Sequence, residues 1–162
     1  MLEVGGGVGG LQIELLKRGA NRTINLELSP AYEGEARALL TEAGLADRVE
    51  RRLHDIAVGA DGVEPADAVV LHRVVCCYPD YERLLGAAAG RARRLLVFSY
   101  PRRNAVARLL VGAENVAFRV MRKEFRTFAH PPDAMLAVVQ AHGLDTKFTH
   151  AGVMWHVAGL TR

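Results

Sequence analysis

A glycine-rich segment near the start of the sequence could bring a ligand into contact with the main chain. It spans residues 3–10 and reads Glu-Val-Gly-Gly-Gly-Val-Gly-Gly, where a strand-like stretch gives way to a helix-like one. Glycines at such a junction permit a tight turn and leave no side chain between backbone and ligand. Gly5, Gly7 and Gly10 also fit the G-x-G-x-x-G pattern of dinucleotide-binding proteins, so the glycines alone leave NAD open as a cofactor.

Acidic residues occur near the ends of three successive strand-like runs. Glu3 lies two residues before Gly5, where its carboxylate would repel a pyrophosphate but attract a cationic amino group. Glu27 could accept hydrogen bonds from both hydroxyls of a ribose, with Leu28 beside it to pack on a base. Asp55 follows the third run. Either Glu27 or Asp55 alone would be interpreted as a surface carboxylate, but the three acids together with the glycines indicate a cofactor site.

These residues make the sequence similar to class I S-adenosylmethionine-dependent methyltransferases. The first motif of that family is an acidic residue followed by alternating glycines, matched here by Glu3, Gly5, Gly7 and Gly9, with Gly6 between them. The resemblance continues through the whole chain. It implies S-adenosylmethionine as the cofactor and transfer of its methyl group to a small-molecule acceptor.

The same resemblance suggests roles for residues further along the chain. It implies that Asp55 meets the adenine amino group, with Ile56 as the apolar neighbour. His72 and Arg73 follow the fourth strand-like run, at the family's position for contacts with the methionine part of the cofactor and with the substrate. Residues 154–160 resemble the family's last strand.

Methyl transfer requires little acid–base chemistry, because the sulfonium is already an activated donor and the protein mainly positions the acceptor in a dry pocket. Some acceptors need a base, and the candidates are His72, Tyr78, Tyr100 and His130. Arg73 and Tyr78 are the expected substrate contacts. No metal site is expected, because the remaining histidines lack metal-ligand spacing and are interpreted as surface or packing residues: His54, His142, His150 and His156.

Strand-length apolar runs alternate with helix-like segments, which predicts an α/β fold. The predicted strands are residues 1–4, 23–28, 49–53, 68–71, 94–100, 145–149 and 153–160. The predicted helices are residues 11–18, 29–44, 81–89 and 131–142. No helix separates the last two strands, so they should form an antiparallel hairpin that turns near Ala151-Gly152. We expect one domain, residues 1–162, with a Rossmann-like, doubly wound sheet of seven mostly parallel strands.

Residues 102–128 interrupt this alternation and should form one or two amphipathic helices, because Phe118, Met121, Phe125 and Phe128 recur at helical spacing. This insertion could cover a substrate pocket or could be an ordinary packing helix. Its arginines could attract an anionic acceptor, although a solvated helix face is the simpler interpretation. These arginines are Arg102, Arg103, Arg119, Arg122 and Arg126.

Composition excludes several other classes of protein. A net charge of +3, with acids spread among the bases, does not indicate a nucleic-acid partner. The sequence has no apolar run of roughly eighteen residues and no basic start followed by an apolar stretch, so neither a membrane span nor a signal peptide is predicted. Cys76 and Cys77 are the only cysteines and are interpreted as small apolar residues in a reducing compartment. We expect a soluble, cytoplasmic protein.

Two other functions stay open at this stage. One is a non-catalytic module that binds S-adenosylmethionine. The other is an NAD-dependent oxidoreductase, which would need a substrate domain that the remaining residues cannot supply and which leaves Glu3 unexplained. The family's domain usually has helices before its first strand, whereas here that strand includes Met1. The chain therefore looks truncated, and we expect either a fragment of a longer protein or a short product whose cofactor site is open on one side.

Overall fold

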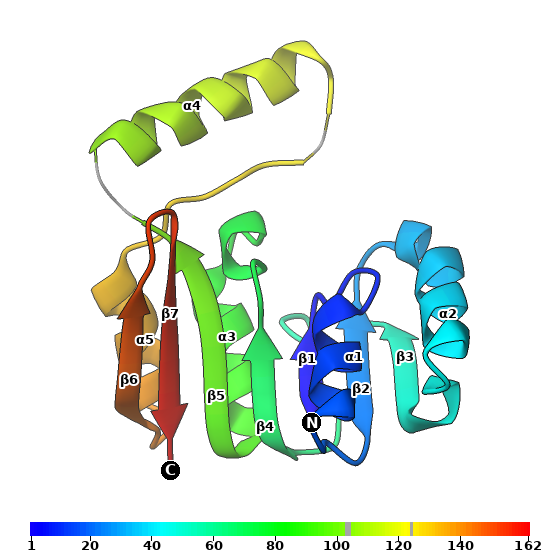
Figure 1. Ribbon diagram of the computed structural model, residues 1–162. Coiled ribbons are helices and arrows are strands. Elements are labelled where there is room, and N and C mark those ends of the chain that lie inside the picture. The colour runs from blue at the N-terminus through cyan, green and yellow to red at the C-terminus, as the bar shows by residue number, and fades with distance from the viewer. Residues whose placement is uncertain (103–104, 124) are drawn as a thin grey trace.

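The computed structural model describes residues 1–102, 105–123 and 125–162. Its strands are β1 (Leu2–Val4), β2 (Thr23–Glu27), β3 (Val49–Leu53), β4 (Ala66–Leu71), β5 (Ala92–Pro101), β6 (Asp145–Ala151) and β7 (Trp155–Thr161). They form one sheet in the order β3-β2-β1-β4-β5-β7-β6 (Figure 1). The strands β1 to β5 are parallel, and β7 runs antiparallel between β5 and β6. The expected seven-stranded sheet with a C-terminal antiparallel hairpin is confirmed.

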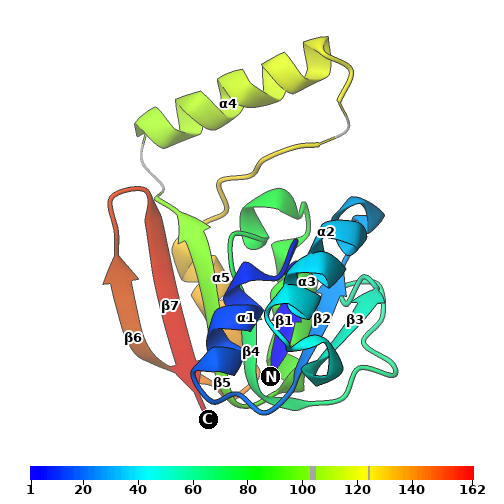
Figure 2. The same cartoon turned by 45° about the vertical axis from the view of Figure 1, so that its right-hand side comes forward.

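Helices cover both sides of this sheet. They are α1 (Gly10–Lys17), α2 (Glu33–Glu42), α3 (Tyr81–Arg91), α4 (Ala105–Val120) and α5 (Pro132–Gln140). The helices α3 and α5 pack side by side on the face opposite α1 (Figures 1 and 2). Polar side chains cap the N-termini of two helical segments. The Ser29 hydroxyl accepts a hydrogen bond from the Ala31 N–H, and the Asp80 carboxylate accepts one from the Arg83 N–H. None of the described helices combines the length and apolar character needed to cross a bilayer.

The larger core lies between the sheet and the pair α3 and α5. Alternation along β5 turns Leu96, Phe98 and Tyr100 into this core, where they meet Leu85 and Met135 from the helices. A smaller apolar cluster on the other face is formed by Leu16, Leu40 and Leu45. This arrangement leaves the ends of the strands free to carry polar groups.

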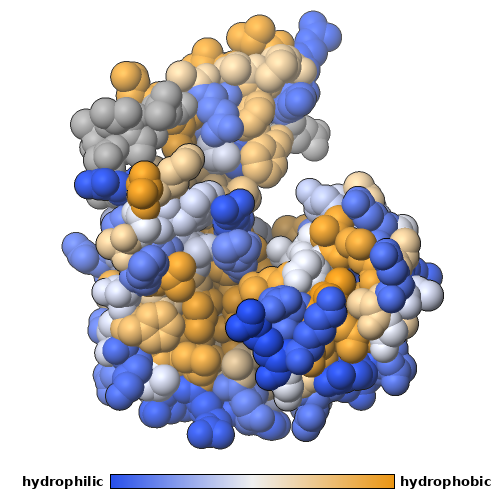
Figure 3. Space-filling model, viewed as in Figure 1, coloured by the Kyte–Doolittle hydropathy of each residue, from blue (hydrophilic) through white to orange (hydrophobic). Residues whose placement is uncertain are grey.

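The strands β4, β5 and β7 also carry apolar side chains on the face opposite the larger core. Val70, Leu95, Val97 and Val157 alternate with buried residues and stay partly exposed. Figure 3 shows apolar surface over the middle of the molecule in this view. The sheet therefore presents apolar side chains to solvent on this side.

The insertion between β5 and α5 contains a single described helix. Helix α4 stands above the carboxyl ends of the parallel strands (Figures 1 and 2). After it the chain reverses, because Arg122 has a left-handed φ of 55° and the Lys123 N–H donates to the Phe118 carbonyl. Phe125 and Phe128 thus lie beyond the helix, so the helical spacing wrongly extended it to residue 128. Arg103, one of the arginines considered above, lies outside the described residues.

The core on the α3 and α5 side should dominate stability. Replacing the fully buried Phe98 with Ala should lower the free energy of unfolding by about 3 to 5 kcal/mol, because apolar contacts are lost and a cavity is left. The matched control is Phe148→Ala on β6, where the side chain is 47% exposed and the loss should be less than half as large. Urea unfolding followed by circular dichroism measures both. Equal losses would contradict the assignment of the core to this face.

Candidate functional site

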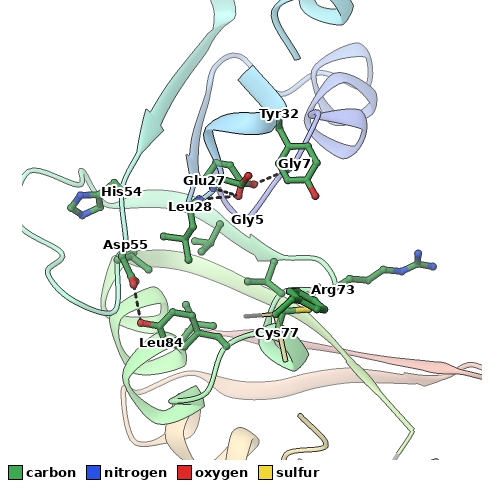
Figure 4. Close-up of a pocket in the computed structure, with 16 residues that line it drawn as sticks. Gly5, Gly7, Glu27, Leu28, Tyr32, His54, Asp55, Arg73, Cys77 and Leu84 are labelled. Atoms are coloured by element: carbon green, nitrogen blue, oxygen red, sulfur yellow. Dashed lines mark hydrogen bonds between the residues drawn. The ribbon is translucent and has the colours of Figure 1, made fainter. Parts of the chain in front are cut away.

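A cavity of about 510 Å³ lies at the carboxyl ends of β1 to β4. Its volume is in the range of small-molecule sites. Because parallel strands end at the same edge of a sheet, the turns that follow these four strands meet there although they are far apart in sequence. The cavity brings together eight of the predicted site residues (Figure 4): Gly5, Gly7, Glu27, Leu28, Asp55, Ile56, Arg73 and Tyr78.

Two glycines shape the loop after β1. Gly5 and Gly7 have left-handed φ values of 67° and 55°, which other residues rarely adopt. A Cβ atom on Gly5 would lie 2.6 Å from the Val74 side chain, whereas one on Gly7 would meet no atom within 4 Å. Gly5 is therefore required for close packing, and Gly7 leaves the main chain open toward the cavity.

Glu27 joins the end of β2 to this loop. One of its carboxylate oxygens accepts hydrogen bonds from the N–H groups of Leu28, at 2.8 Å, and Ser29, at 3.0 Å. The other accepts the Gly7 N–H at 2.8 Å. Each carboxylate oxygen has two lone pairs, so the group can still accept bonds from a ligand. Figure 4 shows the carboxylate beside Gly7 at the cavity wall.

Asp55 and Tyr78 form a second polar pair in the cavity. The Tyr78 hydroxyl donates to Asp55 at 2.9 Å, and the other oxygen of Asp55 accepts the Ala57 N–H at 2.9 Å. Burial and then this hydrogen bond raise the pKa of Tyr78 to about 12. Tyr78 is therefore a proton donor at neutral pH, and it does not suit the role of a base.

A row of polar side chains crosses the sheet beneath the glycine loop. Glu3, Asn25 and Arg51 are in register on β1, β2 and β3. Asn25 accepts the Gly6 N–H at 3.1 Å, and the Arg51 guanidinium donates to the Gly7 carbonyl at 2.8 Å. The sequence analysis missed Arg51, although a charged residue in the middle of a strand was a usable signal.

Arg51 also links this row to α2. Its guanidinium pairs with Glu33 at 2.9 Å, and the Arg51 side chain is almost completely buried. One buried atom of each side chain in the row has no hydrogen-bond partner among the described residues, namely Glu3 Oε2, Asn25 Nδ2 and Arg51 Nη1. Buried polar groups of this kind are rare away from functional sites.

Glu3 lies below the cavity wall. It is 2% exposed, and neither it nor Gly6 or Gly9 is among the residues that line the cavity. A Cβ atom on Gly6 would lie 2.7 Å from Glu3 Oε2, so the carboxyl group sits directly behind Gly6. Burial raises the pKa of Glu3 to about 7, although the nearby Arg51 charge acts in the opposite direction. Glu3 is therefore partly protonated near neutral pH.

Three of the four candidate bases, His72, Tyr100 and His130, lie outside the cavity lining. His72 is exposed, with Nδ1 3.5 Å from the Ser99 hydroxyl, and burial together with the Arg73 charge lowers its pKa. Tyr100 is buried beside Phe98, and burial raises its pKa. The lowered pKa favours a neutral His72 ring that can accept a proton at neutral pH, whereas the raised pKa keeps Tyr100 protonated.

His130 contacts the backbone near the cavity. Its Nε2 atom lies 2.9 Å from the Tyr78 carbonyl, and its ring stacks on Phe128. His130 thus supports the chain that carries Tyr78.

The described residues 1–102, 105–123 and 125–162 contain no group of three or more histidines, cysteines or acids placed to hold a metal ion.

Several cavity residues were not predicted as site residues. His54, interpreted above as a surface or packing residue, lines the cavity, and its Nε2 lies 2.6 Å from the Gly59 carbonyl. Cys77 and Tyr32 line it as well. His54 precedes Asp55 and Cys77 precedes Tyr78, both of which are predicted site residues, but the convergence of the strand ends is what brings these side chains to the cavity.

Phe125 reaches the cavity from the insertion. The segment after α4 is fastened by two hydrogen bonds between Asn115 and Thr127, at 2.7 and 2.9 Å, and by a bond from the Phe128 N–H to the Cys76 carbonyl. These bonds bring part of the insertion to the cavity wall.

Comparisons with known proteins link this architecture to methyltransferases. No family model matches the sequence, and no match is found among curated protein sequences. Solved structures do match. Magnesium protoporphyrin IX methyltransferase (ChlM) from Synechocystis PCC 6803, with bound SAH, has a TM-score of 0.78 and 19% identity, over 99% of this chain and 73% of that chain.

Two further solved structures have the same fold. An O-methyltransferase family protein from Burkholderia thailandensis has a TM-score of 0.81 and 20% identity, over 99% of this chain and 50% of that chain. Geranyl diphosphate C-methyltransferase from Streptomyces coelicolor A3(2), in complex with Mg2+, geranyl diphosphate and S-adenosyl-L-homocysteine, has a TM-score of 0.75 and 13% identity, over 99% of this chain and 70% of that chain. The chain has the fold of class I S-adenosylmethionine-dependent methyltransferases, which confirms the expected resemblance at the level of the fold.

The buried carboxyl group of Glu3 should make stability depend on pH. As the pH rises, the unfolded chain loses this proton near the ordinary pKa of 4.5, whereas the folded protein keeps it until about 7. The stabilisation by this bound proton is complete below pH 4.5 and is lost as the pH rises through 7. Relative to wild type, Glu3→Gln should therefore gain about 2 to 3 kcal/mol of unfolding free energy across this interval.

Urea unfolding at a series of pH values tests this expectation. Glu35→Gln on the exposed surface of α2 is the control, because its carboxylate is in water in both states. Wild type and Glu35→Gln should follow parallel curves, from which Glu3→Gln diverges with rising pH. A Glu3→Gln curve parallel to wild type would show that Glu3 is not a buried, protonated group.

Proposed function

We propose that this protein binds S-adenosylmethionine in the cavity and transfers its methyl group to a small-molecule acceptor. One observation carries the proposal. A glycine loop with open backbone at Gly7, the carboxylate of Glu27 and the carboxylate of Asp55 converge on a single cavity. They do so in a fold shared with solved methyltransferases.

The cavity residues match the parts of this cofactor. Glu27 Oε2, which among the described residues accepts only the Gly7 N–H, would accept a hydrogen bond from a ribose hydroxyl, and Asp55 would accept one from the adenine amino group. Leu28 is 56% exposed and lines the cavity, so it offers an apolar surface for the adenine ring. The Glu3 carboxyl group behind Gly6 is partly ionised near neutral pH, and its ionised form would suit a cationic methionine amino group above the loop.

The same geometry disfavours a dinucleotide. In pyrophosphate sites the N–H groups of a glycine loop point at the phosphates. Here the Gly6 and Gly7 N–H groups already donate to Asn25 and Glu27. A pyrophosphate would also lie close to the Glu27 carboxylate and above Glu3. NAD-dependent oxidation is therefore the weaker alternative.

The chain's own residues would mainly position the acceptor and keep water out. The bound cofactor supplies an activated methyl group, so the barrier depends chiefly on alignment in a dry site. Phe125 closes part of the wall, and Tyr78 offers a fixed hydroxyl donor. His72 is the residue best suited to take a proton from an acceptor that must lose one, since its lowered pKa keeps the ring neutral at pH 7.

Calorimetry with S-adenosylhomocysteine and with NAD tests this proposal. The protein should bind the first and not the second, and Glu27→Ala should weaken S-adenosylhomocysteine binding by about 1.5 to 3 kcal/mol, because a ribose hydroxyl loses a charged acceptor. Glu35→Ala on the exposed side of α2 is the matched control and should bind normally. Binding of NAD alone, or full affinity in a folded Glu27→Ala variant, would overturn the assignment.

The glycine loop supplies a second test with a built-in contrast. Gly7→Val should abolish S-adenosylhomocysteine binding, because it puts a branched side chain at φ 55° on the open side of the loop. Gly86→Ala lies in the middle of α3 away from the cavity, where a Cβ atom comes no closer than 3.4 Å to His142. It should bind normally and be slightly more stable. Normal binding by Gly7→Val would show that the loop is only a turn between β1 and α1 and that its backbone does not contact the ligand.

A further inference from the structure

Arg73 has an unusual backbone conformation at the end of β4. Its φ of 59° lies in the left-handed region, which is uncommon for residues other than glycine. The conformation is held from β5, where the buried Ser99 hydroxyl accepts the Arg73 N–H at 2.8 Å. Strained residues of this kind persist where the surrounding structure holds them, and they gather at binding sites. The turn therefore presents the Arg73 side chain in a defined direction.

That direction leads away from the residues proposed to bind the nucleoside. Arg73 lines the cavity, but its side chain extends away from Glu27 and Asp55 (Figure 4). Its guanidinium carbon lies 5.1 Å from the centre of the Trp155 ring, at the start of β7. The cation thus lies beyond the nucleoside end of the cavity, on the side of β5 and β7.

The guanidinium has no carboxylate partner in the described part of the chain. Contact with an aromatic face leaves the in-plane N–H donors of an arginine free, and their planar fork matches the two oxygens of a carboxylate. Among the described residues that line the cavity, Arg73 is the only lysine or arginine. A single cation is suited to a group with a single negative charge.

Several apolar side chains lie on the path from the cavity to this cation, and His72 is its neighbour in the sequence. Phe125 and Val74 line the same cavity, and Trp155 supports the guanidinium. Val153 and Met154, which precede Trp155 in the turn of the hairpin, are largely exposed. A ligand reaching Arg73 would meet apolar side chains along most of its length and one positive charge at its end.

From these contacts we infer that Arg73 recognises a carboxylate carried by an otherwise apolar methyl acceptor, with Ser99 and Trp155 as positioning residues. This inference rests on the proposed function, because the carboxylate is taken to belong to the acceptor. The competing source of the same chemistry is the methionine carboxylate of the cofactor. An experiment must therefore measure the two ligands separately.

The test uses the emission of Trp155, the only tryptophan in the chain, as a reporter beside Arg73. The protein is first titrated with S-adenosylhomocysteine and then, saturated with it, with hexanoate or hexanamide. These probes share an apolar chain and differ in charge. Hexanoate should bind at least about tenfold more tightly than hexanamide. Arg73→Gln should abolish this preference while its affinity for S-adenosylhomocysteine stays within about twofold of wild type.

Arg93→Gln is the matched control, since Arg93 is an exposed arginine at the start of β5, at the end of the sheet opposite the cavity. It should keep both the affinity for S-adenosylhomocysteine and the preference for hexanoate. Equal binding of the two probes to wild type, or no binding of hexanoate at millimolar concentration, would overturn the inference while leaving the proposed function intact.

Two other outcomes would also be decisive. A large loss of S-adenosylhomocysteine affinity in Arg73→Gln, with the hexanoate preference retained, would overturn the inference by assigning Arg73 to the methionine carboxylate. Failure of the wild-type protein to bind S-adenosylhomocysteine would contradict the proposed function, and this inference with it.

Discussion

The hydrogen bonds between the glycine loop and the side chains beneath it are the constraint on which the site depends. Glycines make the loop flexible, so its own residues cannot hold it in one conformation. Asn25 and Glu27 on β2 accept its N–H groups, and Arg51 on β3 donates to the Gly7 carbonyl. Because these side chains lie on neighbouring parallel strands that pair in register, strand pairing sets the conformation of the loop. The cavity takes its shape from that loop.

This arrangement keeps charge inside the sheet. Buried polar groups reduce stability unless they are fully paired, and Glu3, Asn25 and Arg51 each retain one buried atom without a partner among the described residues. Glu3 has a raised pKa, so its carboxyl group is partly neutral and is not a fully paired charge. In the function proposed above, a cationic ligand over the loop would favour the ionised form of Glu3.

The two sides of the cavity are built differently. On the side of β2 and β3, Glu27 ends β2 and Asp55 lies in the turn after β3, and local backbone N–H groups orient both carboxylates. On the side of β4 and β5, contacts between distant segments dominate, such as the Arg73 bond to Ser99 and the return segment that brings in Phe125. The first side suits a ligand of fixed shape.

The sequence by itself determined the features that depend on local pattern. Alternation of apolar residues defined the strands, and glycines with the following helix signal located the loop. Glu27 and Asp55 were identifiable because a carboxylate at the end of a strand, or just after it, must lie at that end of the sheet, whatever the packing. The hairpin of β6 and β7 followed from the absence of a helix between two strand-like runs.

Only the tertiary structure decided which side chains meet across long separations. Arg51 reaches Gly7 because β3 pairs in register with β2, and Phe125 reaches the cavity because the chain reverses after α4. In the same way Tyr100 and His130, chosen for their chemistry, prove to be packed against other rings and lie outside the cavity lining. Residue type and spacing encode local geometry, whereas the partner of a side chain depends on strand register, helix packing and backbone reversals that no short pattern specifies.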